Sequence, residues 1–143
     1  MASTEHTETI NASADAVWAV MDWLGAKKLA LETTVEKMDI DGDEIGSIRT
    51  VYFKNGTIVR SQLEERDIEK KYYRYHMIDT GDFPFTEYMN SIWVTPLGPD
   101  SCEVKCQVTL TPREGVPEQD CLDSWVDNIK ESSAKLKELA GAS

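Results

Sequence analysis

The order of secondary-structure signals limits most strongly what this chain can fold into. Short alternating stretches are separated by the turn signals D-G-D, N-G, T-G-D and L-G-P-D. Stretches that follow one another through tight turns pair as antiparallel neighbours. The pattern predicts a sheet of about seven strands, over residues 4–10, 35–40, 47–53, 57–66, 72–78, 86–95 and 102–111.

One long amphipathic helix follows the last of these strands. It is expected over residues 117–139, with Pro117 in its first turn and Gly141 beyond its end. Its apolar stripe consists of Leu122, Trp125, Val126, Ile129, Ser133, Leu136 and Leu139. A single stripe needs one apolar sheet face to cover. We therefore expect an α+β fold, in which a curved antiparallel sheet wraps around the helix and leaves a cavity.

One or two short helices are expected after the first strand. Ser13 offers an N-cap hydroxyl group for the first of them. Apolar residues then recur at helical spacing at Val17, Val20, Met21 and Leu24. Gly25 is expected to end this helix, and residues 25–31 to form a second one.

Length and charge narrow the class of protein. The 143 residues are expected to form one domain, 1–143, and the formal net charge is −11. Nucleic-acid and anionic-membrane binding both need a basic face, so neither is expected. The longest clear apolar run, A-V-W-A-V-M, is too short to span a bilayer, and no secretory signal is visible. We expect a cytoplasmic monomer or homodimer without membrane insertion.

The sequence offers no motif for a cofactor or a metal. It contains no phosphate-cradling glycine loop, no G-x-S-x-G elbow and no cluster with metal-ligand spacing. Of the two histidines, His76 has outward parity, so a Ser-His-Asp or Cys-His mechanism is not expected. Cys102, Cys106 and Cys121 are interpreted as reduced core thiols.

The stretch G-S-I-R-T-V-Y-F-K-N-G raises the central question about function. With a period of two, Arg49 shares a strand face with Val51 and Phe53. An arginine on an apolar face either pairs with a carboxylate at the sheet, or is a cation placed inside a pocket. The turn that follows decides which way this face points.

Two turn registers are possible. A two-residue Asn55-Gly56 loop would pair Arg49 with Gln62, and a three-residue loop with a left-handed Gly56 would pair it with Ser61. Ile58, Arg60, Gln62 and Glu64 form the more polar face of the next strand. Because that face should meet water, we choose the three-residue loop, which places Arg49 beside Ser61 on the concave side.

Several segments resemble the START, Bet v 1 and polyketide-cyclase superfamily. They are I-N-A-S-A-D-A-V-W-A-V-M, D-G-D-E-I-G-S-I-R-T-V, Q-L-E-E-R-D, K-Y-Y-R-Y, T-E-Y-M-N-S-I-W-V and P-R-E-G-V-P-E-Q-D. The resemblance covers nearly the whole chain and is greatest to bacterial polyketide cyclase/dehydrase proteins. It implies a helix-grip fold and an internal cavity for a hydrophobic small molecule.

The resemblance also implies roles for particular residues. Arg49 in G-S-I-R matches an inward arginine that meets the ligand in plant members, and Tyr88 in T-E-Y matches their pocket tyrosine. Ser61 falls where those relatives carry a pocket glutamate, so their proton-transfer chemistry does not simply carry over. Glu65 shares the parity of Ser61 but lies about 13 Å along the strand.

The chemistry of these groups supports a pocket. A buried guanidinium group needs acceptors, and the Ser61 and Tyr88 oxygens are the expected ones, together with a ligand carbonyl or carboxylate. Tyr88 would transfer a proton if Arg49 lowered its pKa. Arg49 and Tyr88 are therefore the candidate catalytic residues. The candidate substrate-binding residues are Val51, Phe53, Val59, Ser61, Tyr75, Met77, Phe85, Asn90, Cys106, Val108, Trp125 and Ile129. Residues 83–85 and the K-N-G turn are expected to frame the entrance.

Three functions remain open at this point. The first is a cofactor-independent enzyme of lyase or isomerase type that cyclises, dehydrates or isomerises a polyketide-like carbonyl compound. The second is a carrier or sensor of a hydrophobic small molecule. The third is an interaction protein related to co-chaperones, acting through its acidic surface. We favour the enzyme because of the resemblance to polyketide cyclases.

Overall fold

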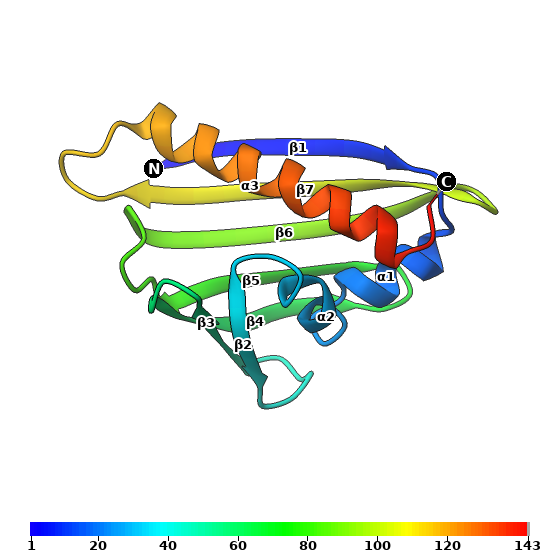
Figure 1. Ribbon diagram of the computed structural model, residues 1–143, viewed down its shortest axis with the longest axis horizontal. Coiled ribbons are helices and arrows are strands. Elements are labelled where there is room, and N and C mark those ends of the chain that lie inside the picture. Colours follow the sequence, from blue (N-terminus) through cyan, green and yellow to red (C-terminus); the bar gives the residue numbers. More distant parts are fainter. Residues whose placement is uncertain (143) are drawn as a thin grey trace.

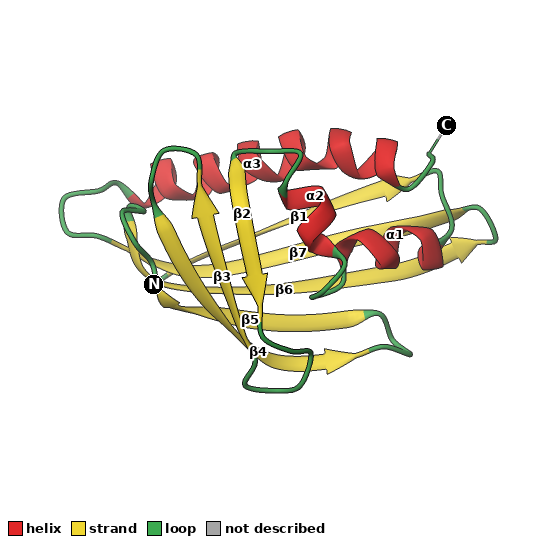
Figure 2. Ribbon diagram, turned by 60° about the horizontal axis from the view of Figure 1, so that its bottom comes forward, coloured by secondary structure: helices red, strands yellow, loops and turns green. Residues whose placement is uncertain are grey.

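The computed structural model describes residues 1–142. One antiparallel sheet faces a long helix, and two short helices lie on the same side of the sheet (Figures 1 and 2). The elements in chain order are β1 (Ala2–Ile10), α1 (Ala14–Met21), α2 (Ala26–Ala30), β2 (Val35–Ile40), β3 (Ile48–Phe53), β4 (Ile58–Asp67), β5 (Tyr72–Asp79), β6 (Phe85–Gly98), β7 (Ser101–Pro112) and α3 (Glu118–Leu139). Every strand and helix predicted from the sequence is present, which confirms the α+β helix-grip fold.

The sheet has the strand order β1-β7-β6-β5-β4-β3-β2, and all neighbours are antiparallel. Consecutive strands are neighbours except β1, which returns to pair with β7. In Figure 2 the strands β2 and β3 cross the direction of β6 and β7 steeply, so the sheet curves around α3. The hairpin succession read from the turns is therefore confirmed.

The β3–β4 hairpin has the three-residue register. Arg49 lies opposite Ser61 and Val51 opposite Val59. The backbone N–H of Phe53 donates to Thr57 O at 2.9 Å, and Gly56 has φ +93°. The left-handed glycine lets the chain turn without exchanging the two faces.

The corner between α1 and α2 departs from the prediction. The N-cap is as expected, because Ser13 Oγ accepts from Ala16 N at 3.1 Å. However, α1 ends at Met21, with Asp22 as its C-cap, so Gly25 does not end it. Leu24 lies outside the helix and is 44% exposed, and the buried residue of this corner is Trp23.

The core fills the space between the sheet and α3. Trp125, Leu136 and the unusual polar residue Ser133 are buried on the helix, and the thiols of all three cysteines are free and buried. Among residues 1–142, none of the helices has the length and apolar character needed to cross a bilayer.

Candidate functional site

Arg49 is buried on the concave face of the sheet, with 6% of its surface exposed. Its guanidinium carbon lies 4.3 Å from the ring centre of Trp23 and 4.8 Å from that of Tyr75. Both aromatic rings therefore stabilise the cation through their π systems. Its Nη1 donates to Trp23 O at 3.3 Å, whereas its Nε has no partner within the described chain.

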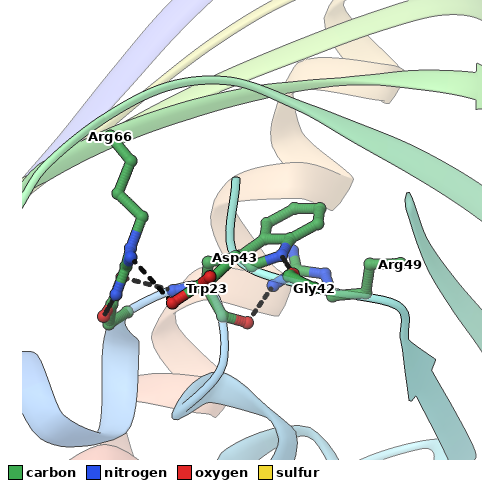
Figure 3. Close-up of polar contacts among 6 residues, drawn as sticks. Trp23, Gly42, Asp43, Arg49 and Arg66 are labelled. Atoms are coloured by element: carbon green, nitrogen blue, oxygen red, sulfur yellow. Dashed lines mark hydrogen bonds and ion pairs between the residues drawn. The ribbon is translucent and has the colours of Figure 1, made fainter. Parts of the chain in front are cut away.

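Two hydrogen bonds donated by Trp23 hold it in place, and Figure 3 shows its surroundings. Its indole N–H donates to Gly42 O at 2.8 Å, and its backbone N–H donates to Asp22 Oδ1 at 2.7 Å. Asp22 in turn accepts from Arg66 Nε at 2.9 Å and from Arg66 Nη2 at 2.5 Å. The α1–α2 corner is thereby tied to β4 and to the β2–β3 loop.

The sequence-based expectation for the acceptors of Arg49 is wrong. No hydrogen bond joins Arg49 to Ser61 or Tyr88 within residues 1–142, and Trp23 O takes that place. None of the ion pairs formed by the described residues involves Arg49, so an internal carboxylate does not neutralise it. The cation is held by aromatic faces instead.

A second buried polar group lies beyond Tyr75. Asn90, 4% exposed, donates from Nδ2 to the Tyr75 hydroxyl at 3.3 Å. Its Oδ1 has no partner within the part of the chain that the structure describes. Tyr75 thus lies between two groups with unpaired atoms. The guanidinium group of Arg49, whose Nε is unpaired, lies over its ring, and Asn90, whose Oδ1 is unpaired, donates to its hydroxyl. A ligand that both accepts and donates would satisfy these two atoms.

Tyr88 is buried and faces α3. Its hydroxyl oxygen accepts from Trp125 Nε1 at 3.0 Å. Burial raises the pKa of Tyr88 well above its usual value, and the neighbouring Tyr75 raises it further. The expectation that Arg49 lowers this pKa is therefore wrong. Burial also raises the pKa of Tyr73, and it is there that Arg49 acts, with a smaller, opposite effect.

An open cleft of about 450 Å³ lies beside the middle of α3. It is lined by Thr33, Thr34, Phe53, Lys54, Asn55, Phe83, Asn128, Glu131 and Ser132. Phe83 and the turn residues Lys54 and Asn55 were the expected frame of an entrance, and they do share this cleft.

A row of aromatic contacts connects the cleft with the buried cation. Phe53 and Phe83 have their ring centres 5.2 Å apart, Phe83 stacks on Phe85 at 5.4 Å, and Phe85 stacks on Tyr88 at 5.0 Å. Tyr88 lies 6.2 Å from Tyr75, whose ring contacts Arg49. Offset and edge-to-face packing of these rings is stabilising, so the row is a continuous aromatic contact between the cleft and Arg49.

The other predicted site residues are distributed over several parts of the interior. Val51 packs in a small separate cluster with Val35 and Met38. Met77 lines a groove beside Tyr88 where β5 and β6 stop pairing. Cys106 and Ile129 line a small cavity against β1. Further predicted residues are fully or nearly fully buried on the sheet, namely Val59, Ser61 and Val108.

Sequence reasoning missed Trp23 and its partner Asp22. A signal was present, because an acidic side chain at the negative C-terminal end of a helix is unfavourable unless a cation meets it. Arg66 is that cation, 44 residues away in the chain. The ionisable residues of β1 and the cleft residues of α3 were also missed.

Comparison with known proteins gives a family. A profile of the family described as polyketide cyclase / dehydrase and lipid transport matches residues 1–141. S-norcoclaurine synthase from Thalictrum flavum subsp. glaucum is 37% identical over 109 residues, which are 70% of this chain and 52% of that protein. The chain thus spans about half the length of this curated relative.

Solved structures agree with this assignment. XoxI from Bacillus cereus superimposes with a TM-score of 0.83 at 20% identity, covering 96% of this chain and 94% of that one. Norcoclaurine synthase from Thalictrum flavum in complex with dopamine and hydroxybenzaldehyde has a TM-score of 0.73 at 26% identity, with 96% and 85% covered. The ZhuI aromatase/cyclase from Streptomyces sp. R1128 has a TM-score of 0.73 at 16% identity, with 97% and 90% covered. The chain therefore belongs to the polyketide cyclase / dehydrase and lipid transport family.

Proposed function

We propose that this protein is a cofactor-independent enzyme that binds a small, flat, hydrophobic carbonyl compound and cyclises, dehydrates or isomerises it. The ligand enters at the cleft between Phe53 and Phe83 and follows the aromatic row inward. Its carbonyl oxygen accepts from Arg49, and a hydroxyl or N–H group donates to Asn90.

The observation that carries this proposal is a buried cation without an anion. Burying a guanidinium group is costly unless its hydrogen bonds and charge are compensated. Arg49 is buried with Nε unpaired, and Asn90 Oδ1 is unpaired on the far side of Tyr75. A bound carbonyl would supply the missing acceptor, and negative charge that develops on its oxygen would be stabilised by the guanidinium group.

Tyr88 acts in this proposal as a neutral donor. Its oxygen already accepts from Trp125, and its raised pKa keeps the hydroxyl proton in place at neutral pH. The proton is thus available for a ligand oxygen in the transition state. The proposed reaction begins with polarisation of the ligand carbonyl group by Arg49.

The relatives support an aromatic substrate. The norcoclaurine synthase structure contains dopamine and hydroxybenzaldehyde, and hydroxybenzaldehyde is a flat aryl carbonyl compound. Its flat ring suits packing against the phenylalanine rings of the cleft, Phe53 and Phe83. We therefore propose aryl aldehydes and ketones as the first compounds to test.

A carrier function is the second candidate, and the family description that includes lipid transport favours it. In a carrier, Arg49 would anchor the polar end of a ligand that leaves unchanged. Native mass spectrometry of the purified protein distinguishes the two functions at the outset. A hydrophobic acid retained at near one-to-one stoichiometry, and lost from Arg49→Ala, would favour the carrier.

The decisive experiment combines binding and turnover. Hydroxybenzaldehyde and aryl poly-β-ketones are titrated by calorimetry, and products are followed by mass spectrometry. We expect Arg49→Gln to lose both affinity and turnover, and Tyr88→Phe to lose turnover while it keeps affinity. Arg60→Gln and Tyr72→Phe are matched controls, because both side chains lie on the other face of the sheet.

Three results can be separated. Turnover that depends on both Arg49 and Tyr88 supports the enzyme. Binding that depends on Arg49 without conversion of any compound replaces the enzyme by the carrier. Binding or turnover that is the same in Arg49→Gln and in Arg60→Gln removes the buried cation from the function altogether.

A further inference from the structure

β1 turns two ionisable side chains toward the interior. His6 and Glu8 share a face with Ala2 and Ile10, which are 2% and 0% exposed, whereas the intervening residues of the strand are exposed. Core-facing positions of a strand are normally apolar. The presence of two ionisable groups there therefore needs a physical reason.

Both side chains line a cavity of about 40 Å³ under the C-terminal half of α3. The apolar part of its lining comes from Met21, Leu29, Val104, Ile129 and Leu136, and the remaining residues are Cys106, Ser132 and Ser133. One water molecule needs roughly 10–15 Å³ of such space, so the cavity admits a group of about two or three heavy atoms.

The hydrogen bonds of the pair are incomplete. His6 Nε2 and Glu8 Oε2 are buried and have no partner among residues 1–142. The other carboxylate oxygen, Glu8 Oε1, lies 3.6 Å from Lys137 Nζ on α3. Buried polar atoms almost always have a partner, so these two atoms point to a bound group that supplies donors.

Each of three polar groups in the cavity can act as an acceptor. A carboxylate oxygen only accepts, the unprotonated nitrogen of a neutral imidazole accepts, and a serine hydroxyl such as that of Ser133 can accept. Three acceptors match the three N–H donors of a primary ammonium group, and Glu8 provides the opposite charge. We propose that this cavity binds the ammonium group of a compact primary amine.

The surroundings are compatible with a bound cation. Lys137 on α3 pairs with the other carboxylate oxygen, Glu8 Oε1, at 3.6 Å, so Glu8 Oε2 is left without a partner within residues 1–142. From β7 the cavity receives Cys106, whose pKa burial raises to about 12, so this thiol stays neutral. The net charge of −11 also raises the local concentration of cations.

The proposed amine site does not depend on the function assigned to Arg49. The two sites are nevertheless close, because Ser132 lines both this cavity and the cleft beside Phe83. An amine with an aromatic body would reach both. A compact amine without such a body tests the cavity alone.

The test uses the two histidines of the chain. Methylammonium chloride is titrated into the protein while the imidazole proton signals of His6 and His76 are followed by NMR. We expect a saturable shift at His6 and none at His76, which lies on β5, three strands away from β1 in the sheet. Tetramethylammonium, which has no N–H donor and is too large, and sodium chloride at equal ionic strength should not produce it. Glu8→Gln should weaken the binding roughly tenfold, because it removes a charge-assisted hydrogen bond.

Glu5→Gln is the matched control, since Glu5 lies on the outward face of the same strand and pairs with Lys105. If Glu8→Gln does not fold, Ser133→Val fills the cavity and should abolish the His6 shift instead. A His6 shift that fails to saturate, that tetramethylammonium or sodium chloride reproduces, or that survives in Glu8→Gln and Ser133→Val would overturn the proposal.

Discussion

The guanidinium group of Arg49 lies 4.3 Å from the ring centre of Trp23 and donates to the carbonyl oxygen of the same residue at 3.3 Å. One residue of the α1–α2 corner therefore contacts the cation through both its ring and its backbone. Because Asp22 and Arg66 fix that corner, they also determine where Arg49 lies.

Asp22→Asn should loosen Arg49 from a distance. The substitution weakens the paired hydrogen bonds to Arg66, whose side chain is only 13% exposed, and we expect a loss of about 2 kcal/mol in the free energy of unfolding. The Arg49 Nε–H and Trp23 indole N–H signals should shift in NMR spectra. Arg74→Lys is the control, because Arg74 pairs with Glu64 on more exposed positions and should cost under about 1 kcal/mol. Unchanged Arg49 and Trp23 signals in Asp22→Asn would contradict the coupling.

Gly25→Ala should disrupt the same corner for a steric reason. Its backbone has φ −68°, which any residue adopts, but a Cβ atom would lie 2.0 Å from Ala19 O. We expect a loss of about 3 kcal/mol or more in the free energy of unfolding, measured by urea denaturation. Gly56→Ala is the comparison, because Gly56 has φ +93° and open space around it, so only backbone strain of about 1 kcal/mol applies. Equal losses of unfolding free energy at the two positions would show that the backbone of the α1–α2 corner shifts to make room for the Cβ atom.

The alkaline limit of stability should be set by buried tyrosines and a thiol. Burial raises the pKa of Tyr73 and of Tyr88 above 10.0, and that of Cys106 from 9.0 to about 12. In the unfolded chain these groups lose their protons at lower pH than in the folded chain. Their contribution to stability is therefore complete below about pH 9 and declines as the pH rises toward about 12.

Urea midpoints measured from pH 8 to pH 11, together with tyrosinate absorbance, check this expectation. Each group should remove up to about 1.4 kcal/mol per pH unit once its unfolded form has ionised. Tyr88→Phe should reduce the decline, whereas Tyr52→Phe, at a half-exposed position, serves as the control. The absorbance difference between the wild type and Tyr88→Phe reports Tyr88 alone, and its appearance before any loss of stability would be inconsistent with a buried Tyr88 hydroxyl.

Asn90→Leu should separate stability from ligand binding. Because Asn90 Oδ1 is buried without a partner, an apolar side chain of similar size should leave the free energy of unfolding unchanged or raise it by about 1 kcal/mol. Loss of the Tyr75 hydrogen bond opposes part of this gain. Calorimetry with hydroxybenzaldehyde should show weaker binding in the variant. A strongly destabilised Asn90→Leu would instead mean that the amide serves the fold.

Much of the fold followed from local rules. The inward parity of Arg49 could be predicted because the three-residue turn with Gly56 and the polar face of the next strand agree on one register. The boundaries of α2 and α3 followed from similar local signals. Arg49 was accordingly found buried on the concave face, and Lys54 and Phe83 line one cleft.

The polar partners could not be predicted in the same way. Trp23 meets Arg49 across 26 residues, and Asp22 meets Arg66 across 44, so no spacing rule joins them. The raised pKa of Tyr88 depends on its burial against α3, which the sequence pattern of β6 does not contain. Tertiary burial, rather than the strand pattern, decides the chemistry of these groups.

The pairing of β1 with β7 has a consequence during synthesis. Ala2 pairs with Leu110 and Ile10 with Cys102, so β1 leaves the ribosome long before its partner exists, at a sequence separation of roughly one hundred residues. An unpaired strand is a site of aggregation, and inward-pointing charged residues are a known protection. His6 and Glu8 thus disfavour pairing of the nascent β1 with strands of other chains until β7 has been translated and can pair with it.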